Sequence, residues 1–412
     1  MEEQQCGLWR SCCRVEDLKI LGFRMKIGFI GAVPPASVFP EDCILPRYRK
    51  PTHPAPWIGG LLPELARLAD FELRVFVVHR AVAKPCVVER GGVQYEGVPS
   101  PMLERFAPHT FFHSKSFVVS GAIRRFRPDL IHAFGLENGF GTIALRHGVP
   151  VSCFLQGIAE RYLPYYGQRS FINKRVAVAC ERAAVKQVRW MIAETEFARD
   201  WALGHNPDAR VEVIPHPLRP VFLGAESTPD AKRIISVGGL DHRKGMDTII
   251  RAFARVGDPE ARLCIVGGGP SEGELRALAA ELKVEGQTEF AGVADTEQVL
   301  EELSKSSIFV IASRMDTSPN VLTEAHAVGL PVIGTKVGGI PEMIDEGVDG
   351  FQVEMDGVEE MAERMRCLLE DPNKARTMGA HGKEKVRVLN DPARVAGVQA
   401  QFFQRIREDL GK

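Results

Sequence analysis

The sequence lacks Asp-x-Asp pairs, Cys-x-x-Cys pairs and long apolar runs. Because no segment reaches the ~18 apolar residues that a membrane span needs, we expect no membrane-spanning helix. Residues 1–24 carry mixed charges and lack the apolar stretch of a signal peptide. Nine cysteines, an odd number without paired spacing, suit a reducing compartment. These absences predict a cytoplasmic protein.

Neither positive nor negative charge is in excess over the whole chain, since the net charge is −1. Residues 25–215 nevertheless hold 24 Lys and Arg against 17 Asp and Glu, whereas residues 216–385 hold 19 against 29. Opposite charges favour contact between the two halves, and a basic half also favours an anionic membrane or an acidic acceptor. Both interpretations stay open, and we expect no nucleic-acid partner.

The 412 residues favour two domains, since one hydrophobic core rarely serves a chain of this length. Short apolar runs alternate with amphipathic stretches, which is typical of parallel α/β units. The expected strands of the first half are KIGFIG, LRVFVV, DLIHAF, VPVSCF, WMIA and VEVIP. Those of the second half are RIISVGG, RLCIVGG, TEFAG, SIFVIA and PVIGT, after the proline-rich IPHPLRPVF.

These patterns predict an α/β protein of two doubly wound, Rossmann-like domains that face each other across a cleft. We expect an extension at 1–24, an acceptor-binding domain at 25–215, a nucleotide-sugar-binding domain at 216–385, and a helix at 386–412 that returns to the first domain. Parallel sheets bind ligands at the carboxyl ends of their strands, so the site should lie between the domains.

The densest cluster of polar residues, SRMDTSPNVLTEAHAVGLPVIGTKVGGIPE, follows the expected strand SIFVIA. Ser318 is a suitable N-cap and Pro319 a suitable first helical residue, so a helix should begin there and end at Gly329. The free backbone N–H groups of Asn320 and Val321 would then attract a phosphate.

Two carboxylates, Asp316 and Glu324, lie eight residues apart in this cluster and can reach one pocket. Carboxylates accept hydrogen bonds from paired sugar or ribose hydroxyls. A second cluster, SVGGLDHRKGMD, follows the first strand of the second half. Its Arg243 and Lys244 would supply positive charge for a diphosphate.

With these motifs in order, the chain resembles the retaining GT-B glycosyltransferases of family 4, the group that includes glycogen and sucrose synthases. The resemblance runs from Met25 to about Leu410 and is strongest in the second half. It implies transfer of a hexose-type sugar from a nucleotide-diphosphate sugar, with retained anomeric configuration. The acceptor would be a glycan, a lipid-linked sugar or a small molecule, in polysaccharide or glycoconjugate biosynthesis.

The resemblance also assigns roles to residues. Lys244 would contact the diphosphate, Glu324 the ribose and Asp316 the transferred sugar. The remaining donor-binding positions are Gly239, Arg243, Asn320 and Val321, with Gly59 and Gly60 in a glycine loop, WIGG. We expect no cofactor and no metal, since the Asp-x-Asp pair of metal-dependent transferases is absent and cations with a helix N-terminus can meet the diphosphate charge.

Three residues depart from the family pattern. Asp316 replaces a glutamate, Gly239 replaces an arginine beside the diphosphate, and Gln156 replaces a histidine that touches the sugar at a catalytic position. Because glutamine does not titrate, Gln156 can only hydrogen-bond. His132, in DLIHAFG, is either a structural residue or a sugar or acceptor contact, since its strand end points at the cleft.

Other functions remain open. A sugar-nucleotide epimerase or hydrolase of the same fold, or a non-catalytic nucleotide-sugar binder, would share this site, whereas the loose glycine pattern IVGGGPSEGEL is a weak signal for a dehydrogenase. Residues 105–127 mix arginines and a lysine with phenylalanines. That stretch is either an ordinary amphipathic helix or a peripheral contact with the inner face of an anionic membrane.

Overall fold

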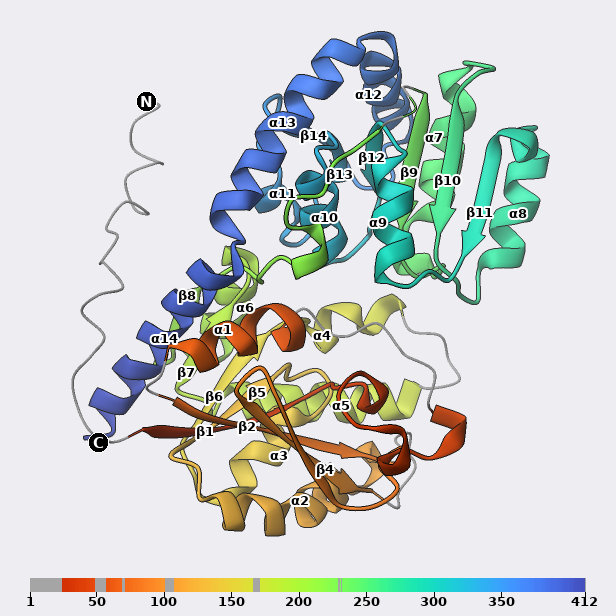
Figure 1. Cartoon of the computed structure of the whole chain (residues 1–412). Coiled ribbons are helices and arrows are strands. Elements are labelled where there is room, and N and C mark those ends of the chain that lie inside the picture. The colour runs from red at the N-terminus through yellow and green to blue at the C-terminus, as the bar shows by residue number, and fades with distance from the viewer. Residues whose placement is uncertain are drawn as a thin grey trace.

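The computed structural model describes residues 24–48, 57–68, 71–100, 107–165, 171–228, 230 and 232–411. Of the expected extension at 1–24, residues 1–23 lie outside this set. Among the helices of the described residues, none has the length and hydropathy needed to span a membrane. Two α/β lobes make up the described chain, one above the other in Figure 1.

The first lobe contains an eight-stranded sheet in the order β3-β4-β2-β1-β5-β6-β7-β8. All its neighbouring strands are parallel except the pair β3 and β4, which is antiparallel. The strands are β1 Met25–Gly31, β2 Phe71–His79, β3 Cys86–Arg90, β4 Val93–Pro99, β5 Leu130–Phe134, β6 Val151–Leu155, β7 Trp190–Ala193 and β8 Arg210–Val213. The central strands β5, β6 and β7 are buried throughout, as strands covered on both faces must be.

Helices cover both faces of this first sheet. One core joins the sheet to α1 and to α14, the helix Pro392–Asp409, and a second core joins the other face to α2, α3, α5 and α6. The helices of the lobe are α1 Leu62–Arg67, α2 His113–Phe126, α3 Phe140–Ala144, α4 Ala159–Tyr162, α5 Phe171–Val185 and α6 Glu196–His205.

The second lobe contains a six-stranded, wholly parallel sheet in the order β11-β10-β9-β12-β13-β14. Its strands are β9 Arg233–Val237, β10 Arg262–Val266, β11 Thr288–Gly292, β12 Ile308–Ile311, β13 Val332–Thr335 and β14 Gly350–Val353. Two cores again flank the sheet, one with α7, α8 and α12 and the other with α9 and α10. The helices of this lobe are α7 Met246–Val256, α8 Glu272–Glu281, α9 Thr296–Ser304, α10 Asn320–Val328, α11 Ile340–Met343, α12 Val358–Glu370 and α13 Pro372–Leu389.

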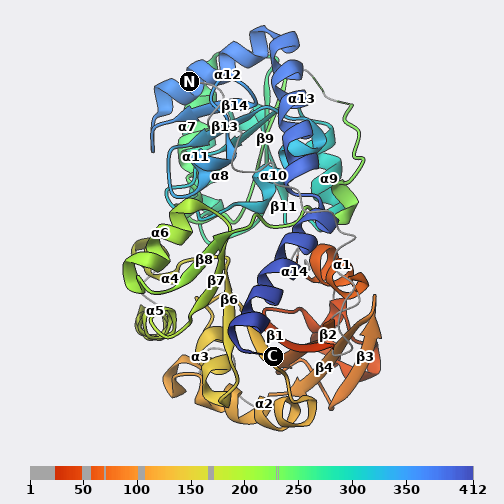
Figure 2. The same cartoon turned by 90° about the vertical axis from the view of Figure 1, so that its left-hand side faces the viewer.

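The chain crosses between the lobes twice. The first crossing is the segment 214–222, and the second lies between α13 and α14, where Leu218 N–H donates to Asn390 O at 2.7 Å and Asn390 Nδ2 donates to His216 O at 2.8 Å. Helix α14 then lies on the first lobe beside α1 (Figures 1 and 2) and buries Phe402, Phe403 and Ile406 in its core. The expected fold class is therefore confirmed, although α13 continues past the expected boundary at residue 385.

Candidate active site between the lobes

Two turns of the second lobe, one after β9 and one after β13, contact the loop that follows β12. Gly245 has φ +64° and sits where a Cβ would lie 2.0 Å from Ala312 O, so only glycine fits there. Gly338 has φ +58°, and its Cβ would lie 1.9 Å from Asp316 O. These close approaches bring the segments after β9, β12 and β13 together at the carboxyl end of the sheet, where parallel sheets bind ligands.

Lys244 and Asp316 form an ion pair at the centre of this junction. Lys244 Nζ lies 2.6 Å from Asp316 Oδ2, with Arg243 Nη1 at 3.5 Å and Ser313 Oγ donating to the same oxygen at 3.2 Å. Burial opposes the charged form of Asp316, but Lys244 and Arg243 outweigh it, and the net pKa of Asp316 is lowered. A carboxylate and two cations therefore meet at one place, so an incoming phosphate would compete with Asp316 for Lys244.

Arg314, which the motif analysis missed, braces this junction. Its side chain, 9% exposed, donates to both Asp247 oxygens at 2.9 and 2.8 Å and to His242 O at 2.7 Å. Its Nη2 lies 2.8 Å from Asp356. These contacts raise the pKa of Arg314 against the effect of its burial and fix the turn that carries Arg243 and Lys244. The signal available in the sequence was an arginine directly after a buried strand.

Helix α10 begins one residue later than expected, with Pro319 in the N-cap position and no side-chain cap from Ser318. Ser318 Oγ instead lies 3.3 Å from His216 Nδ1. The backbone N–H groups of Asn320 and Val321 have no acceptor among the described residues. The helix N-terminus, four residues after Asp316 in the chain, therefore offers two free donors, and the helix ends at Gly329, as expected.

Glu324, in the second turn of α10, pairs with Arg219 of the first crossing. Arg219 Nε donates to Glu324 Oε1 at 2.8 Å and Arg219 Nη2 lies 2.6 Å from the same oxygen. Both residues are buried, and burial raises the pKa of Glu324 while Arg219 opposes that rise. Sequence motifs did not point to Arg219, which is 105 residues away in the chain.

The first lobe contributes the residues that follow β6. Gln156 comes directly after β6 and is half-buried. Six residues later Tyr162 Oη shares a hydrogen bond of 2.9 Å with Thr317 Oγ1, and its ring lies 4.9 Å from the guanidinium of Arg243. Tyr165 Oη also donates to Arg314 O at 2.9 Å. The segment after Gln156 thus closes onto the loop that holds Asp316.

Three carboxyl groups of the first lobe have raised pKa values, the buried Glu181 and Glu194 and the half-buried Glu137. Glu181 accepts hydrogen bonds from the backbone N–H groups of Ala159 and Glu160 at 2.8 and 2.9 Å, yet burial raises its pKa to about 7. Glu137 follows β5, and burial raises its pKa to about 8. Burial likewise raises the pKa of Glu194 well above its usual range, with Asp316 and Glu137 adding to the rise. Sequence analysis did not single out these groups.

The expected glycines take different positions. Gly60 lies in the single π-helical turn Trp57–Leu61 before α1, and a Cβ there would lie 3.1 Å from Leu218 O in the first crossing. Gly59 in the same turn is exposed, with open space around it among the described residues. Gly239 is also exposed and lies two residues after β9, where a Cβ would meet Asp241 Oδ2 at 3.5 Å.

His132 lies in the core, which favours the structural one of the two interpretations of this residue. It is fully buried, its Nδ1 lies 2.8 Å from Ser152 Oγ, and its ring packs against Phe29, Phe134 and Phe403. Burial lowers its pKa to about 3. The side chain points into the core beneath α14 because alternate residues of a strand face opposite sides of the sheet.

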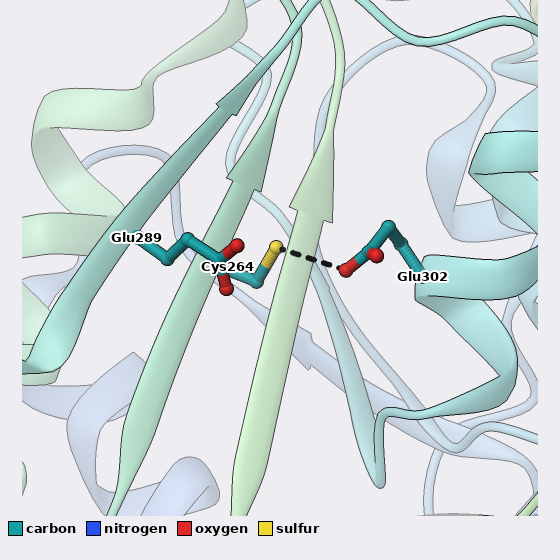
Figure 3. Close-up of side chains that lie close together, drawn as sticks. All are labelled: Cys264, Glu289 and Glu302. Atoms are coloured by element: carbon teal, nitrogen blue, oxygen red, sulfur yellow. Dashed lines mark hydrogen bonds between the residues drawn. The ribbon is translucent and has the colours of Figure 1, made fainter.

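A group with metal-ligand chemistry lies on the second sheet, away from the junction. The ligand atoms of Cys264, Glu289 and Glu302 come within 4.8 Å of one another (Figure 3). Arg233 pairs with Glu302 and, at 3.1 Å, with Glu289, and burial raises the pKa of Cys264 to about 12. A guanidinium already supplies the positive charge here, and a neutral thiol is a poor metal ligand, so we assign no metal site to this group.

Two family models match the chain, one for each lobe. Residues 57–217 match the model described as "Glycosyl transferase 4-like domain", and residues 225–385 match the one described as "Glycosyl transferases group 1". Together they cover more than three quarters of the 412 residues.

The chain spans about half the length, or less, of the curated relatives that it matches. N-acetyl-alpha-D-glucosaminyl L-malate synthase of Bacillus anthracis is 34% identical over 43% of this chain and 47% of that protein. A second relative, from Corynebacterium glutamicum, is 34% identical over 35% of this chain and 39% of the relative's chain. It is a GDP-mannose-dependent monoacylated alpha-(1-6)-phosphatidylinositol monomannoside mannosyltransferase.

Solved structures extend the likeness to nearly the whole chain. Sucrose-phosphate synthase of Thermosynechococcus elongatus superposes with a TM-score of 0.76 and 19% identity, over 94% of this chain and 100% of the other. With both domain models in this order on the same two-lobed fold, the chain belongs to the GT-B glycosyltransferases, a glycosyl transferase 4-like domain followed by a group 1 domain.

Proposed function

We propose that the protein is a retaining glycosyltransferase of family 4 that moves a hexose-type sugar from a nucleotide-diphosphate sugar to a glycan, lipid-linked or small-molecule acceptor. The observation that carries this proposal is the ion pair of Lys244 and Asp316 beside the free N-terminus of α10. Cations and backbone donors that converge in one cleft fit a diphosphate, and an adjacent carboxylate fits the hydroxyls of a sugar.

The arrangement favours departure of the nucleoside diphosphate. As the bond from the sugar carbon to the diphosphate oxygen breaks, negative charge grows on that oxygen and the sugar becomes oxocarbenium-like. Lys244, Arg243 and the N-terminus of α10 are held in place before the reaction, so they stabilise this charge without reorganisation. In a retaining reaction the acceptor attacks from the same face and its proton passes to the leaving phosphate.

A screen of nucleotide sugars followed by product analysis tests this function. A ligand that binds only the native protein, at a free concentration of about 100 times its Kd, raises the free energy of unfolding by about 2.7 kcal/mol. The donor therefore identifies itself by the thermal shift that it causes. With that donor and a panel of acceptors, we expect NMR of the product to show the anomeric configuration of the donor. An inverted product would contradict retention, donor consumption without any acceptor would favour an epimerase or hydrolase, and tight binding without turnover would favour a non-catalytic binder.

We further propose that the protein works in the cytoplasm at an anionic membrane, which it contacts through the first lobe. On and next to α2, Phe117 is 83% exposed and Phe111 is 54% exposed, with the exposed Arg124 and Arg127 on the same helix or at its end. Other members of the basic stretch do not fit such a face, since Phe112 and Lys115 are buried, and Arg105 and Phe106 lie outside the described residues.

Replacing Phe117 with serine tests the membrane contact. An exposed phenylalanine that enters the interface contributes through the apolar area it buries, at about 25 cal/mol per Å². We therefore expect Phe117→Ser to weaken sedimentation with phosphatidylglycerol vesicles about fivefold or more. The exposed Val293, on the second lobe, offers a matched control as Val293→Ser, which should leave sedimentation unchanged. Equal binding of the wild-type protein to neutral and anionic vesicles would contradict the proposal.

A further inference from the structure

A buried arginine joins the first crossing between the lobes to the proposed ribose-binding carboxylate. Arg219 is 6% exposed and Glu324 is 4% exposed. A charge at such a depth is tolerated only when it is paired, because removal of one partner leaves the other uncompensated. The pair therefore determines the position and the charge state of Glu324.

Other contacts fix the guanidinium of Arg219 itself. Its Nη1 donates to Thr296 Oγ1 at 2.8 Å, at the first residue of α9, and its Cζ lies 5.0 Å from the ring centroid of Phe222. The neighbouring Leu218 is hydrogen-bonded to Asn390 of the second crossing. Arg219 is thus held from several sides and cannot simply follow Glu324.

The two contacts that Arg219 makes with Glu324 use the same carboxylate oxygen, Oε1. An ionised carboxylate offers about four lone-pair sites on two oxygens. With Oε1 held by the guanidinium, Oε2 is the oxygen left to accept further hydrogen bonds. The fork of an arginine fixes the plane of the carboxylate in a way that the single point charge of a lysine does not.

We propose that Arg219 is a positioning residue for nucleotide recognition: it holds Glu324 Oε1 so that Oε2 accepts the ribose hydroxyls of the donor. This inference rests on the proposed function, in which Glu324 contacts the ribose. Arg219 would therefore make the site prefer ribonucleotides over deoxyribonucleotides. It would do so through Glu324, without contacting the nucleotide itself.

Calorimetric titration with nucleotides that differ in one hydroxyl tests the proposal. UDP and GDP are compared with their 2′-deoxy and 3′-deoxy forms, using the wild type, Glu324→Gln, Arg219→Met and Arg219→Lys. A hydrogen bond to a charged group corresponds to a preference of about 10-fold or more for the ribose form. We expect Arg219→Met to reduce this preference to within about 2-fold, and Arg219→Lys to reduce it at least about 3-fold, because lysine cannot hold the carboxylate plane. Arg233→Met, which removes an arginine from two carboxylates outside the cleft, should leave the preference unchanged.

The possible results distinguish a failure of the positioning role of Arg219 from a failure of the proposed function. Loss of the preference in Glu324→Gln together with full preference in a folded Arg219→Met would overturn the positioning role and leave the proposed function standing. If Arg219→Met does not fold, full preference in Arg219→Lys overturns it in the same way. A wild type that binds neither diphosphate, or binds the deoxy forms equally well, would instead contradict the ribose contact and thus the proposed site.

Discussion

Replacing Lys244 with alanine should lower kcat/KM for sugar transfer about 100- to 1000-fold, the usual cost of removing one preorganised group that stabilises developing charge. Lys244 Nζ lies 2.6 Å from Asp316, inside the cluster that we expect to hold the diphosphate. The variant also leaves Asp316 without its nearest cation, so the binding of the transferred sugar should weaken as well. Initial rates over a range of donor concentrations measure both effects.

A matched control separates the loss of this contact from the loss of any lysine. Lys232, just before β9, pairs with Glu260 at 2.5 Å at the opposite end of the same sheet. We expect Lys232→Ala to keep kcat/KM within about 2-fold of the wild type, because exposed ion pairs contribute little. Transfer at the wild-type rate by Lys244→Ala would show that the diphosphate binds elsewhere.

Alanine at Gly245 should disassemble the site rather than weaken a single contact. The residue has φ +64°, and a Cβ would lie 2.0 Å from Ala312 O. The left-handed conformation costs an L-residue about 1–2 kcal/mol, and overpacking adds about 1–3 kcal/mol. We expect Gly245→Ala to reduce the free energy of unfolding by about 3 kcal/mol and to abolish nucleotide binding, since the turn that carries Lys244 must shift.

The other end of the same helix offers a control with the same backbone conformation. Gly257 follows α7 with φ +74°, and apart from its chain neighbours no atom of the described residues lies within 4 Å of where its Cβ would be. Gly257→Ala should therefore lose only the about 1–2 kcal/mol of the left-handed conformation and keep nucleotide binding intact. Chemical denaturation and calorimetry on both variants distinguish these effects. Equal stability losses would contradict the role of the contact between Gly245 and Ala312.

Local patterns predicted the elements that carry a strong periodicity. The expected strands WMIA and TEFAG have the bounds of β7 and β11, and Gly329 ends α10 as expected. Strands β3, β4 and β14 were missed. Strand β3 has no buried residue and ends with Glu89 and Arg90, β4 carries the polar Gln94 and Glu96, and β14 begins with a glycine, so none is the continuous apolar run typical of a buried parallel strand.

The residues of the site were predictable where a motif follows a strand, and unpredictable where the partner is distant in the chain. Lys244 and Asp316 lie in the loops that follow two neighbouring parallel strands, β9 and β12, so their meeting follows from the topology. Arg219 pairs with Glu324 only because the crossing segment folds back onto α10. The role of His132 stayed open between a structural one and a ligand contact, because strand position alone does not say which face of the sheet a side chain takes.

The claim that a cationic turn and a helix N-terminus hold a diphosphate without a metal is tested most directly by calorimetry in EDTA. The affinity of the diphosphate of the identified donor is compared with that of the matching nucleoside, in the wild type and in Lys244→Ala. We predict that the wild type binds the diphosphate about 100-fold more tightly than the nucleoside, and that Lys244→Ala loses most of this advantage. An advantage that appears only when Mg²⁺ is added, or that survives in Lys244→Ala, would contradict the account.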